Sequence, residues 1–369
     1  MIILATETPQ KPSPTTPKKI KIGIPRALPF YRFFPFWKTL LEELGAEIVL
    51  SPPTTKKIVE EGCAMGFGEL CLPMKVYYGH FLKLIRDNPD LDYVFVPRYV
   101  STRIGAYYCP KFLSLPDVSR IIPGAPPILD WDVNVKEHPT ITSVRELAQK
   151  LGKGDQEAAA AYKKAGAAFQ SFHAMVRRGM YCGDALKRVE KNLPLTPPQK
   201  EETPEVRLLL LGHPYNLFDT YVNLDFYKKL KKQGASVITL ENLPHEIFKL
   251  PVVINGLLRN YWSHEEEILA AGRYFLTKGR KEIDGIIFLI SFACGPDSLM
   301  SELIMRDMKV VSLPFLALII DEHSGEGGML TRIESFVEMI KRKKRVLAAT
   351  SPVSPVQAVL KSPNMEMDL

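Results

Sequence analysis

A strand-helix-strand pattern occurs twice in this chain, and it limits the possible folds more than any other feature. In the first half, residues 19–25 have strand character and stop at Pro25, a helix follows that ends at Gly45, and residues 46–50 form a second strand. One apolar face of that helix repeats at spacings of three and four through Tyr31, Phe34, Trp37, Leu40, Leu41 and Leu44. Units of this kind build parallel sheets.

The second half repeats the order of the first. Residues 206–214 again form a strand that stops at a proline, and residues 234–240 form the next strand. The helix expected between them carries the apolar positions Phe218, Tyr221, Leu224, Tyr227 and Leu230. Later in each half, residues 91–97 and residues 283–289 match as further strands. The sequence therefore predicts an α/β protein with two Rossmann-like or flavodoxin-like parallel-sheet domains, whose carboxyl edges face each other across a cleft.

The expected domain organisation has five parts. Residues 1–18 are a Thr-, Pro- and Lys-rich segment expected to be a disordered leader, and 19–150 form the first α/β domain. Residues 151–204 form a helical insert and a proline-rich linker, in which Asp155 is expected to cap an alanine-rich helix. The second α/β domain covers 205–347, and 348–369 is a loose tail. The insert is either a cap over the cleft or an oligomer contact.

Composition excludes several classes of protein. The chain has 369 residues and a net charge of +7, with no zinc-finger, helix-turn-helix or RNP pattern, so nucleic acid is not an expected partner. No window approaches about 18 uninterrupted apolar residues, which argues against a membrane span. Five cysteines are an odd number without the density of a disulfide scaffold. These features predict a cytoplasmic protein.

The sequence around Cys294 is the strongest candidate for a site. The branched apolar run from Ile286 to Ile290 is typical of a buried parallel strand, and it leads to a cysteine followed by Gly, Pro, Asp and Ser. Asp297 or Ser298 is expected to cap a helix that begins at Leu299. The positive end of that helix would favour the thiolate of Cys294, which binds metals or attacks substrates.

The cysteines separate into two kinds. Cys71, Cys109 and Cys294 have a proline within two residues, whereas Cys63 and Cys182 have helical surroundings without one. Each alone fits a small buried apolar residue. Three thiolates that converge on a cleft suit an iron-sulfur cluster with one open iron, or a three-thiolate zinc site.

Two further alternatives remain open at this point. A zinc site would need a fourth ligand, for which His80 and His323 are the candidates. A Cys-His hydrolase is a third possibility, although no family motif supports it. His213, in Gly-His-Pro-Tyr, is interpreted as an ordinary loop histidine.

Several motifs together resemble one family, the acyl-CoA dehydratase activase-related proteins. These are distant relatives of the iron-sulfur subunits of 2-hydroxyacyl-CoA dehydratase, benzoyl-CoA reductase and double-cubane cluster proteins. The resemblance runs from Lys19 to Arg345 without the helical insert. The motifs, in order, are Ile22-Gly-Ile-Pro-Arg26, Ser51-Pro-Pro-Thr54, Glu69-Leu-Cys71-Leu-Pro73-Met-Lys75, Val96-Pro-Arg98, Cys109-Pro-Lys-Phe112, Gly212-His-Pro-Tyr-Asn216, Cys294-Gly-Pro-Asp-Ser-Leu299 and Asp321-Glu-His-Ser-Gly-Glu326.

The resemblance implies a 4Fe-4S or larger cluster held by Cys71, Cys109 and Cys294 between the two domains. It also implies low-potential electron transfer, or reduction of a small anionic or CoA-linked substrate, in a protein of paired subunits. In the relatives, a separate ATP-dependent activase supplies the electron. This chain has no glycine loop ending in Lys-Ser or Lys-Thr, so it does not resemble that ATPase.

Polar residues near the motif cysteines are candidates for contacts to cluster sulfide or to an anionic substrate. They are Lys75, Arg98, Lys111 and Ser298, together with His323 and Glu326 in the acidic loop that follows the apolar strand 315–320. The alternative function is a non-catalytic scaffold, stabilised by zinc or a cluster, that docks on an ATP-dependent activase.

Overall fold

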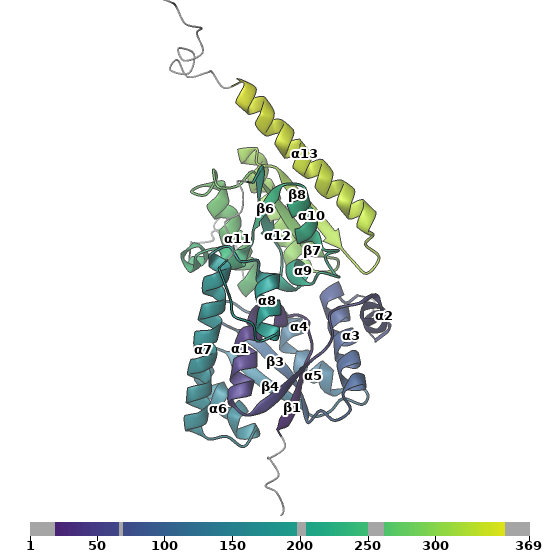
Figure 1. Cartoon of the computed structure of the whole chain (residues 1–369), viewed down its shortest axis with the longest axis vertical. Coiled ribbons are helices and arrows are strands. Elements are labelled where there is room, and N and C mark those ends of the chain that lie inside the picture. The colour runs from purple at the N-terminus through teal and green to yellow at the C-terminus, as the bar shows by residue number, and fades with distance from the viewer. Residues whose placement is uncertain (1–18, 66–68, 198–203, 250–261, 351–369) are drawn as a thin grey trace, which may run out of the picture.

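The computed structural model describes residues 19–65, 69–197, 204–249 and 262–350, and two parallel sheets dominate it (Figure 1). The first sheet has the strand order β2-β1-β3-β4, and the second has the order β6-β5-β7-β8. All pairings between neighbouring strands in both sheets are parallel. The predicted α/β fold with two parallel-sheet domains is therefore confirmed. The expected leader, 1–18, and residues 351–369 of the expected tail lie outside the described residues.

The first sheet is covered by amphipathic helices. Its strands are β1 (Ile20–Ile24), β2 (Ala46–Leu50), β3 (Tyr93–Ser101) and β4 (Ile128–Asn134). The helices of this half are α1 (Phe30–Glu43), α2 (Lys56–Met65), α3 (Leu72–Asp87), α4 (Pro110–Leu113), α5 (Leu115–Arg120) and α6 (Thr140–Lys150). The predicted apolar face of α1, including Phe34, Trp37 and Leu40, is buried.

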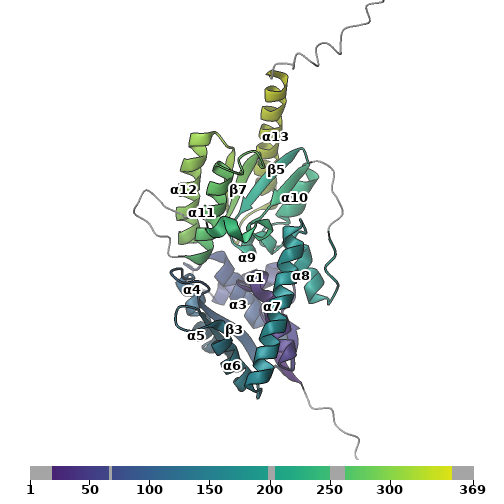
Figure 2. The ribbon, with the colours of Figure 1, turned by 90° about the vertical axis from the view of Figure 1, so that its left-hand side faces the viewer.

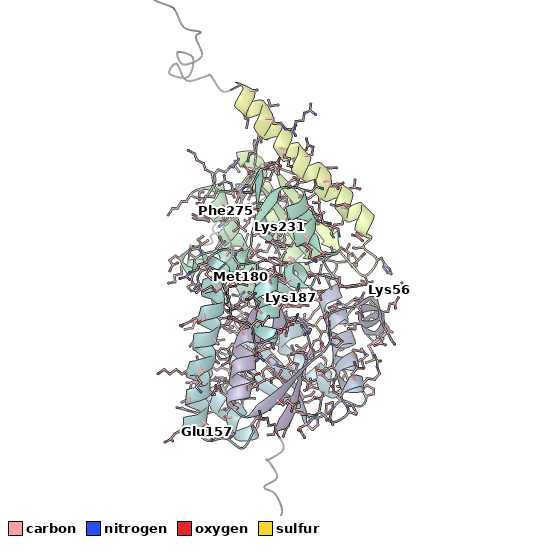
Figure 3. The ribbon with its side chains drawn as sticks, in the orientation of Figure 1. Lys56, Glu157, Met180, Lys187, Lys231 and Phe275 are labelled. Carbon is pink, nitrogen blue, oxygen red and sulfur yellow. The ribbon has the colours of Figure 1, made fainter. Side chains whose placement is uncertain are left out.

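The helical segment after the first sheet packs on the first domain. It consists of α7 (Asp155–Arg177) and α8 (Cys182–Glu190), and α7 runs beside α1 in Figure 1. Phe169 of α7 stacks on Phe33, and Lys164 forms an ion pair with Glu43. Asp155 is the first residue of α7 and not its cap, because the N-cap is Gly154, whose N–H donates to Glu157. Met180 lies just beyond α7, where the two halves meet (Figure 3).

The second half repeats the architecture. Its strands are β5 (Val206–Leu211), β6 (Ala235–Ile238), β7 (Gly285–Ser291) and β8 (Phe315–Ile320). Its helices are α9 (Pro214–Phe218), α10 (Phe226–Lys232), the 3₁₀ turns η1 (Leu240–Asn242) and η2 (His245–Lys249), α11 (Ser263–Leu276), α12 (Gly295–Val311) and α13 (Glu326–Thr350). The far end of α13 projects beyond the sheets (Figures 1 and 2).

The prediction of one helix from Phe218 to Leu230 was wrong. The chain leaves the helical conformation after α9, and Leu224 and Asp225 adopt left-handed backbone angles with φ of 55° and 57°. Non-glycine residues rarely adopt this conformation, and it cannot continue a right-handed helix. Asn223 stabilises the break, because its side chain donates to the carbonyl of Leu217 at 2.8 Å and accepts from the N–H of Phe226 at 3.2 Å.

The carboxyl ends of the two sheets face each other, and polar side chains join the halves there. The hydroxyl of Tyr31 donates to Asp219 at 2.9 Å, and Lys75 forms an ion pair with Glu322 at 2.5 Å. α9 lies at this junction in Figure 2. Polar groups from α1 and α3 of the first half therefore meet groups that follow α9 and β8 of the second half. No helix in the described part of the chain has both the length and the apolar character that crossing a membrane requires.

Candidate functional site

Four residues share one structural position at the junction of the two halves. Cys71, Cys109, His213 and Cys294 are the N-caps of α3, α4, α9 and α12. Each is followed by a proline in the first turn of its helix, where a missing N–H costs nothing. None of the four side chains hydrogen-bonds its own helix end. These thiols and this imidazole are therefore available for other partners.

Cys71 and Cys109 lie close together on the side of the first domain. The Nζ of Lys111 donates to the Sγ of Cys71 at 3.3 Å. Burial raises the pKa of Cys109, the nearby Lys111 opposes this effect, and Cys71 adds to it. Lys111, proposed from the sequence as a donor to the site, therefore contacts a predicted ligand directly.

Cys294 lies on the side of the second domain, at the end of the buried strand β7. Ala293 has a left-handed φ of 62°, a strained conformation for a non-glycine residue that turns the chain sharply before the cysteine. The helix α12 begins at Gly295, with Cys294 as its cap. The prediction that Asp297 or Ser298 caps a helix starting at Leu299 was wrong, because Pro296 already occupies the first turn.

The expected thiolate at Cys294 also needs correction. Burial and the neighbouring Asp297 raise the pKa of the thiol to about 11, although His213 acts in the opposite direction. In the absence of a bound metal, Cys294 is therefore protonated at neutral pH. The positive end of one helix does not outweigh desolvation beside a buried carboxylate. A metal would have to displace this proton in order to bind.

His213 is the residue that sequence reasoning undervalued. Its ring lies between the rings of Tyr215 and His264, with centroids 4.8 and 4.5 Å away. Its Nε2 is 3.4 Å from Glu265 Oε1 and 3.4 Å from Asp297 Oδ1, but it makes a well-formed hydrogen bond with neither. Burial disfavours the charged ring, but Asp297, Cys294 and Glu265 raise its pKa well above the usual value.

The backbone brings His213 to this position through Gly212. Gly212 has a φ of 143°, and a Cβ there would lie 2.6 Å from the carbonyl oxygen of Leu289 on β7. Only glycine permits this close approach of β5 and β7 directly before the histidine. The sequence contained a signal for His213, because a proline follows it directly, and a proline also lies within two residues of each motif cysteine.

Tyr215 connects the two sides of the site. Burial raises its pKa well above the usual value, and Cys294, Asp297 and Cys71 add to this effect. The ring of Tyr215 also lines, with Cys109 and His213, a cavity of about 30 Å³. Tyr215 thus lies near Cys71, Cys109 and Cys294, but among the described residues the close group of ligating atoms is His213, Cys294 and Asp297, not the three cysteines. Cys63, on α2, and Cys182, at the start of α8, belong to other elements.

Unsatisfied polar atoms mark the same place. Among the described residues, the buried atoms without a hydrogen-bond partner include Nε2 of His213, both carboxylate oxygens of Asp297 and Nδ2 of Asn216. Buried polar atoms are normally satisfied, so such a group calls for an explanation such as a ligand, an ion or water. His213, Cys294 and Asp297 each offer a ligand atom within 4.8 Å of the others, which is the spacing of a single-ion site.

The donor chemistry of the site fits an iron-sulfur cluster, but the space around Cys109 is small. Three thiols and a nearby lysine suit an anionic cluster that needs hydrogen-bond donors. A cavity of about 30 Å³ has room only for water. A cluster would therefore enter only if Tyr215 or another side chain around the cavity moved.

The other candidates from the first domain have local partners. Lys75 is buried in its ion pair with Glu322. Arg98 forms an ion pair with Asp117 at 2.8 Å and donates to the carbonyl of Leu113. Contacts from Lys75 and Arg98 to a cluster or a substrate remain predictions.

The candidates from the second domain lie near the ends of α12 and α13. The hydroxyl of Ser298 donates to the carbonyl of Cys294 at 2.8 Å, one turn back along α12. The backbone N–H of His323 donates to Asp321, and Glu326 forms an ion pair with Lys229 at 2.9 Å. A contact of any of these to a cluster or a substrate remains a prediction.

His80, the other candidate for a zinc ligand, is already satisfied. Its Nδ1 lies 2.9 Å from the hydroxyl of Ser51, and its Nε2 lies 2.8 Å from that of Thr54. The residue is fully buried, and burial together with Arg26 lowers its pKa to about 3. Both ring nitrogens have partners, so His80 is not a free ligand and the expectation that it could complete a zinc site was wrong.

Comparison with known proteins agrees with the resemblance predicted from the motifs. No sequence among curated proteins matches the chain at a significant level. The family model described as "CoA enzyme activase uncharacterised domain" matches residues 21–243. This match covers more than half of the 369 residues, including the first sheet and the start of the second. The chain therefore belongs to the CoA enzyme activase uncharacterised domain family.

Proposed function

We propose that this protein is an iron-sulfur redox protein whose cluster is held by Cys71, Cys109 and Cys294 between the two α/β domains. The observation that carries the proposal is the shared position of the three cysteines. Each caps a helix that starts with a proline in its first turn, and each lies near Tyr215. Three thiols from two domains are an unusual donor set for any ligand other than a metal or a cluster.

The surroundings support an anionic group at this place. The helices α3 and α12 begin at Cys71 and Cys294, and the first turn of a helix carries a partial positive charge. Lys111 adds a positive charge at 3.3 Å from the sulfur of Cys71. A bound cluster would supply one-electron chemistry at low potential. The residues of the chain would hold it, balance its charge and exclude water.

Membership of a CoA-enzyme-activase-related family supports the proposed partners. These are an ATP-dependent activase, or another low-potential electron donor, and an acyl-CoA or small anionic substrate. The chain carries no glycine loop of the Walker type, so ATP hydrolysis is assigned to the partner. Reduction of a CoA-linked substrate and electron transfer to another protein are both compatible with this arrangement.

Iron and acid-labile sulfide content of protein purified without oxygen tests the proposal. The wild type is expected to be brown and to contain both elements. Cys71→Ser, Cys109→Ser and Cys294→Ser should each lose most of the iron, whereas the matched controls Cys63→Ser and Cys182→Ser should keep it. If all six proteins remain colourless after reconstitution with iron and sulfide, the cluster proposal is wrong.

One specific observation favours a second candidate, a metal-stabilised scaffold. His213, Cys294 and Asp297 together form the arrangement of a mononuclear site, and their buried atoms lack partners. Zinc accepts all three ligand types. Metal analysis separates the two candidates, because a zinc site would give colourless protein that loses zinc on His213→Gln and keeps it on Cys71→Ser.

A further inference from the structure

A second cavity, larger than the one beside Cys109, opens between the two halves. It has a volume of about 640 Å³, within the range of small-molecule sites in proteins. One wall comes from α1, the segment after β3 and α7, and the other comes from η1, η2 and α11. This cavity is called the junction cleft below, and none of the three motif cysteines lines it.

Most charged side chains in the wall of the junction cleft are paired with one another. Arg32 forms two hydrogen bonds with Glu267, at 2.6 and 2.7 Å, and Arg103 forms an ion pair with Glu266. Burial lowers the pKa of Arg32, but Glu267 and, more weakly, Glu241 raise it, so the carboxylate of Glu241 also lies near this guanidinium. These five residues therefore need no cation from a ligand.

Two further cations of the wall lack such a partner. Arg177, in the last turn of α7, and Lys249, at the end of η2, are both exposed, and neither forms an ion pair or a hydrogen bond through its side chain with a described residue. Counted with neutral histidines, the described lining residues comprise four cations and three carboxylates. The cleft thus has a surplus of one positive charge.

Three polar side chains form one face of α7 along the cleft. Gln170, His173 and Arg177 are spaced by three and four residues, which places them on the same side of a helix, with neighbouring Cβ atoms about 5–6 Å apart. None of the three side chains has a hydrogen-bond or ion-pair partner among the described residues. This face of α7 therefore presents neighbouring polar groups to the cleft.

His173 is held in position, but its nitrogens remain accessible. Its ring packs against Phe169 and Phe172, with centroids 4.4 and 5.4 Å away. Neither nitrogen is among the fully buried atoms without a partner in the described part of the chain. Burial, together with Arg32 and Arg177, lowers the pKa of His173 to about 4, so at pH 7 the neutral ring carries one N–H that can donate.

The rest of the cleft is largely apolar and aromatic. Phe33, Phe169 and Phe248 line it, together with Leu240 and Leu243. Phe33 and Phe169 are stacked on each other, with ring centroids 6.0 Å apart, so this part of the wall is preformed. Such a surface suits an apolar group of the ligand, and a flat ring in particular.

From this arrangement we propose that the junction cleft binds an organic monoanion that has one carboxylate and an apolar body. The carboxylate would pair with Arg177 and accept a hydrogen bond from His173, one turn away on the same face of α7. The apolar body would lie against Phe33, Phe169 and Phe248. A single negative charge balances the surplus of the wall, whereas a cation would add to it.

Arg177 also has a simpler explanation, which the experiment must separate from binding. A cation in the last turn of a helix offsets the negative end of the helix dipole, whether or not a ligand is present. Arg178, the C-cap of α7, is an exposed arginine at the same helix end, but it does not line the cleft. The two neighbouring arginines therefore distinguish a general effect of charge from a contact inside the cleft.

The junction cleft shares part of its wall with the cysteine site. Arg32 and Phe33 line both the junction cleft and the small cavity that Cys109 and His213 line. Binding of a carboxylate in the cleft needs no metal, so this proposal is independent of the proposed cluster.

Isothermal titration calorimetry of the full chain tests the proposal with three probes that have the same apolar body. They are 4-phenylbutanoate, the uncharged 4-phenylbutanamide and the cationic 4-phenylbutylamine. The carboxylate should bind at millimolar concentration or below. The amide and the amine should bind about tenfold more weakly or worse, because neither can accept charge-assisted hydrogen bonds through a carboxylate.

Three variants complete the design. Arg177→Gln removes the charge and should weaken binding of 4-phenylbutanoate about tenfold, while binding of the amide stays unchanged. His173→Phe keeps a flat ring but removes the N–H donor, and it should weaken the carboxylate about fivefold. Arg178→Gln is the matched control and should bind like the wild type.

Three outcomes would overturn the proposal. They are a lack of binding of 4-phenylbutanoate at millimolar concentration, equal affinity for the carboxylate and the amide, and equal weakening by Arg177→Gln and Arg178→Gln. The last outcome would mean that the helix end attracts anions without a contact in the cleft. Cys294→Ser should bind the carboxylate normally, so a failure here is distinguishable from a failure of the cluster proposal.

Discussion

Two buried histidines near the junction of the domains show how a scaffold differs from a site. Each ring nitrogen of His80 has a hydroxyl partner. One of these hydroxyls, that of Thr54, also donates to Asp219. His213 is equally buried, but its Nε2 lies between two carboxylates without a well-formed hydrogen bond. Both ring nitrogens of His80 therefore have hydrogen-bond partners, whereas Nε2 of His213 has none.

The difference also appears in the electrostatics. Burial lowers the pKa of His80 to about 3, which keeps the ring neutral as its hydrogen bonds require. Asp297 and Glu265 raise the pKa of His213 despite its burial. A fully satisfied network of buried hydrogen bonds stabilises one conformation of the fold. An unsatisfied network beside a cysteine is a candidate binding site.

The largest expected effect comes from the same substitution at both histidines. His80→Leu removes one hydrogen-bond partner from the buried hydroxyl of Ser51 and one from that of Thr54, so it should lower the free energy of unfolding by about 3 kcal/mol. His213→Leu breaks no well-formed hydrogen bond at Nε2, but it removes the positive charge beside the buried carboxylates of Glu265 and Asp297, so it should also destabilise the fold, by about 3 kcal/mol. Urea unfolding of metal-free protein at pH 7.5 measures both. A cost of about 1 kcal/mol or less for His80→Leu would contradict the satisfied hydrogen-bond network at His80.

A second effect comes from pH. The folded pKa of His80, about 3, lies below its ordinary value of 6.5, so between these values the unfolded chain binds a proton that the folded chain excludes. Stability should therefore be unaffected by His80 above pH 6.5 and fall as the pH drops below it, by about 2 kcal/mol at pH 5. His173, whose pKa burial lowers to about 4, acts in the same direction.

His80→Leu is the control for this pH effect. The variant should lose less stability than the wild type between pH 7.5 and pH 5, because one of the two excluded protons no longer contributes. Urea unfolding at the two pH values gives the comparison. If the variant shows the same pH dependence as the wild type, His80 is not kept neutral in the folded protein. That result would contradict the proposed hydrogen-bond network around His80.

The smallest effect is expected at a polar residue that the sequence placed near the site. Arg98 is engaged by Asp117 and by the carbonyl of Leu113 in a partly exposed position. Arg98→Gln should cost about 1 kcal/mol or less and should leave the metal content unchanged. Unfolding and metal analysis of the same preparation check both parts. A loss of metal would place Arg98 at the site after all.

Much of the fold could be predicted because the signals are local. Runs of branched apolar residues mark β5, β7 and β8, and the spacing of three and four on α1 identifies its buried face. The break between α9 and α10 could not be predicted in this way. Asp225 is a residue type that tolerates left-handed angles, but Leu224 is not, and the apolar spacing continues through the break.

The candidate site was predictable only in part, for a different physical reason. A proline within two residues singled out Cys71, Cys109 and Cys294, and the proline that follows His213 could have singled it out in the same way. The sequence does not reveal distant pairings such as Lys75 with Glu322, which join residues 247 positions apart. Nor does it reveal that burial beside Asp297 keeps Cys294 protonated. The local sequence pattern identifies the candidate site residues, whereas tertiary contacts set their partners and their protonation.

The most direct test of the central claim is anomalous X-ray diffraction from crystals of protein prepared without oxygen, recorded at the iron and zinc absorption edges. The account predicts a strong iron peak between Cys71, Cys109 and Cys294, with the ring of Tyr215 displaced to make room. A zinc peak between His213, Cys294 and Asp297 would support the mononuclear site instead. Crystals without a peak at either edge, grown from reconstituted protein, would contradict the claim that this junction is a metal centre.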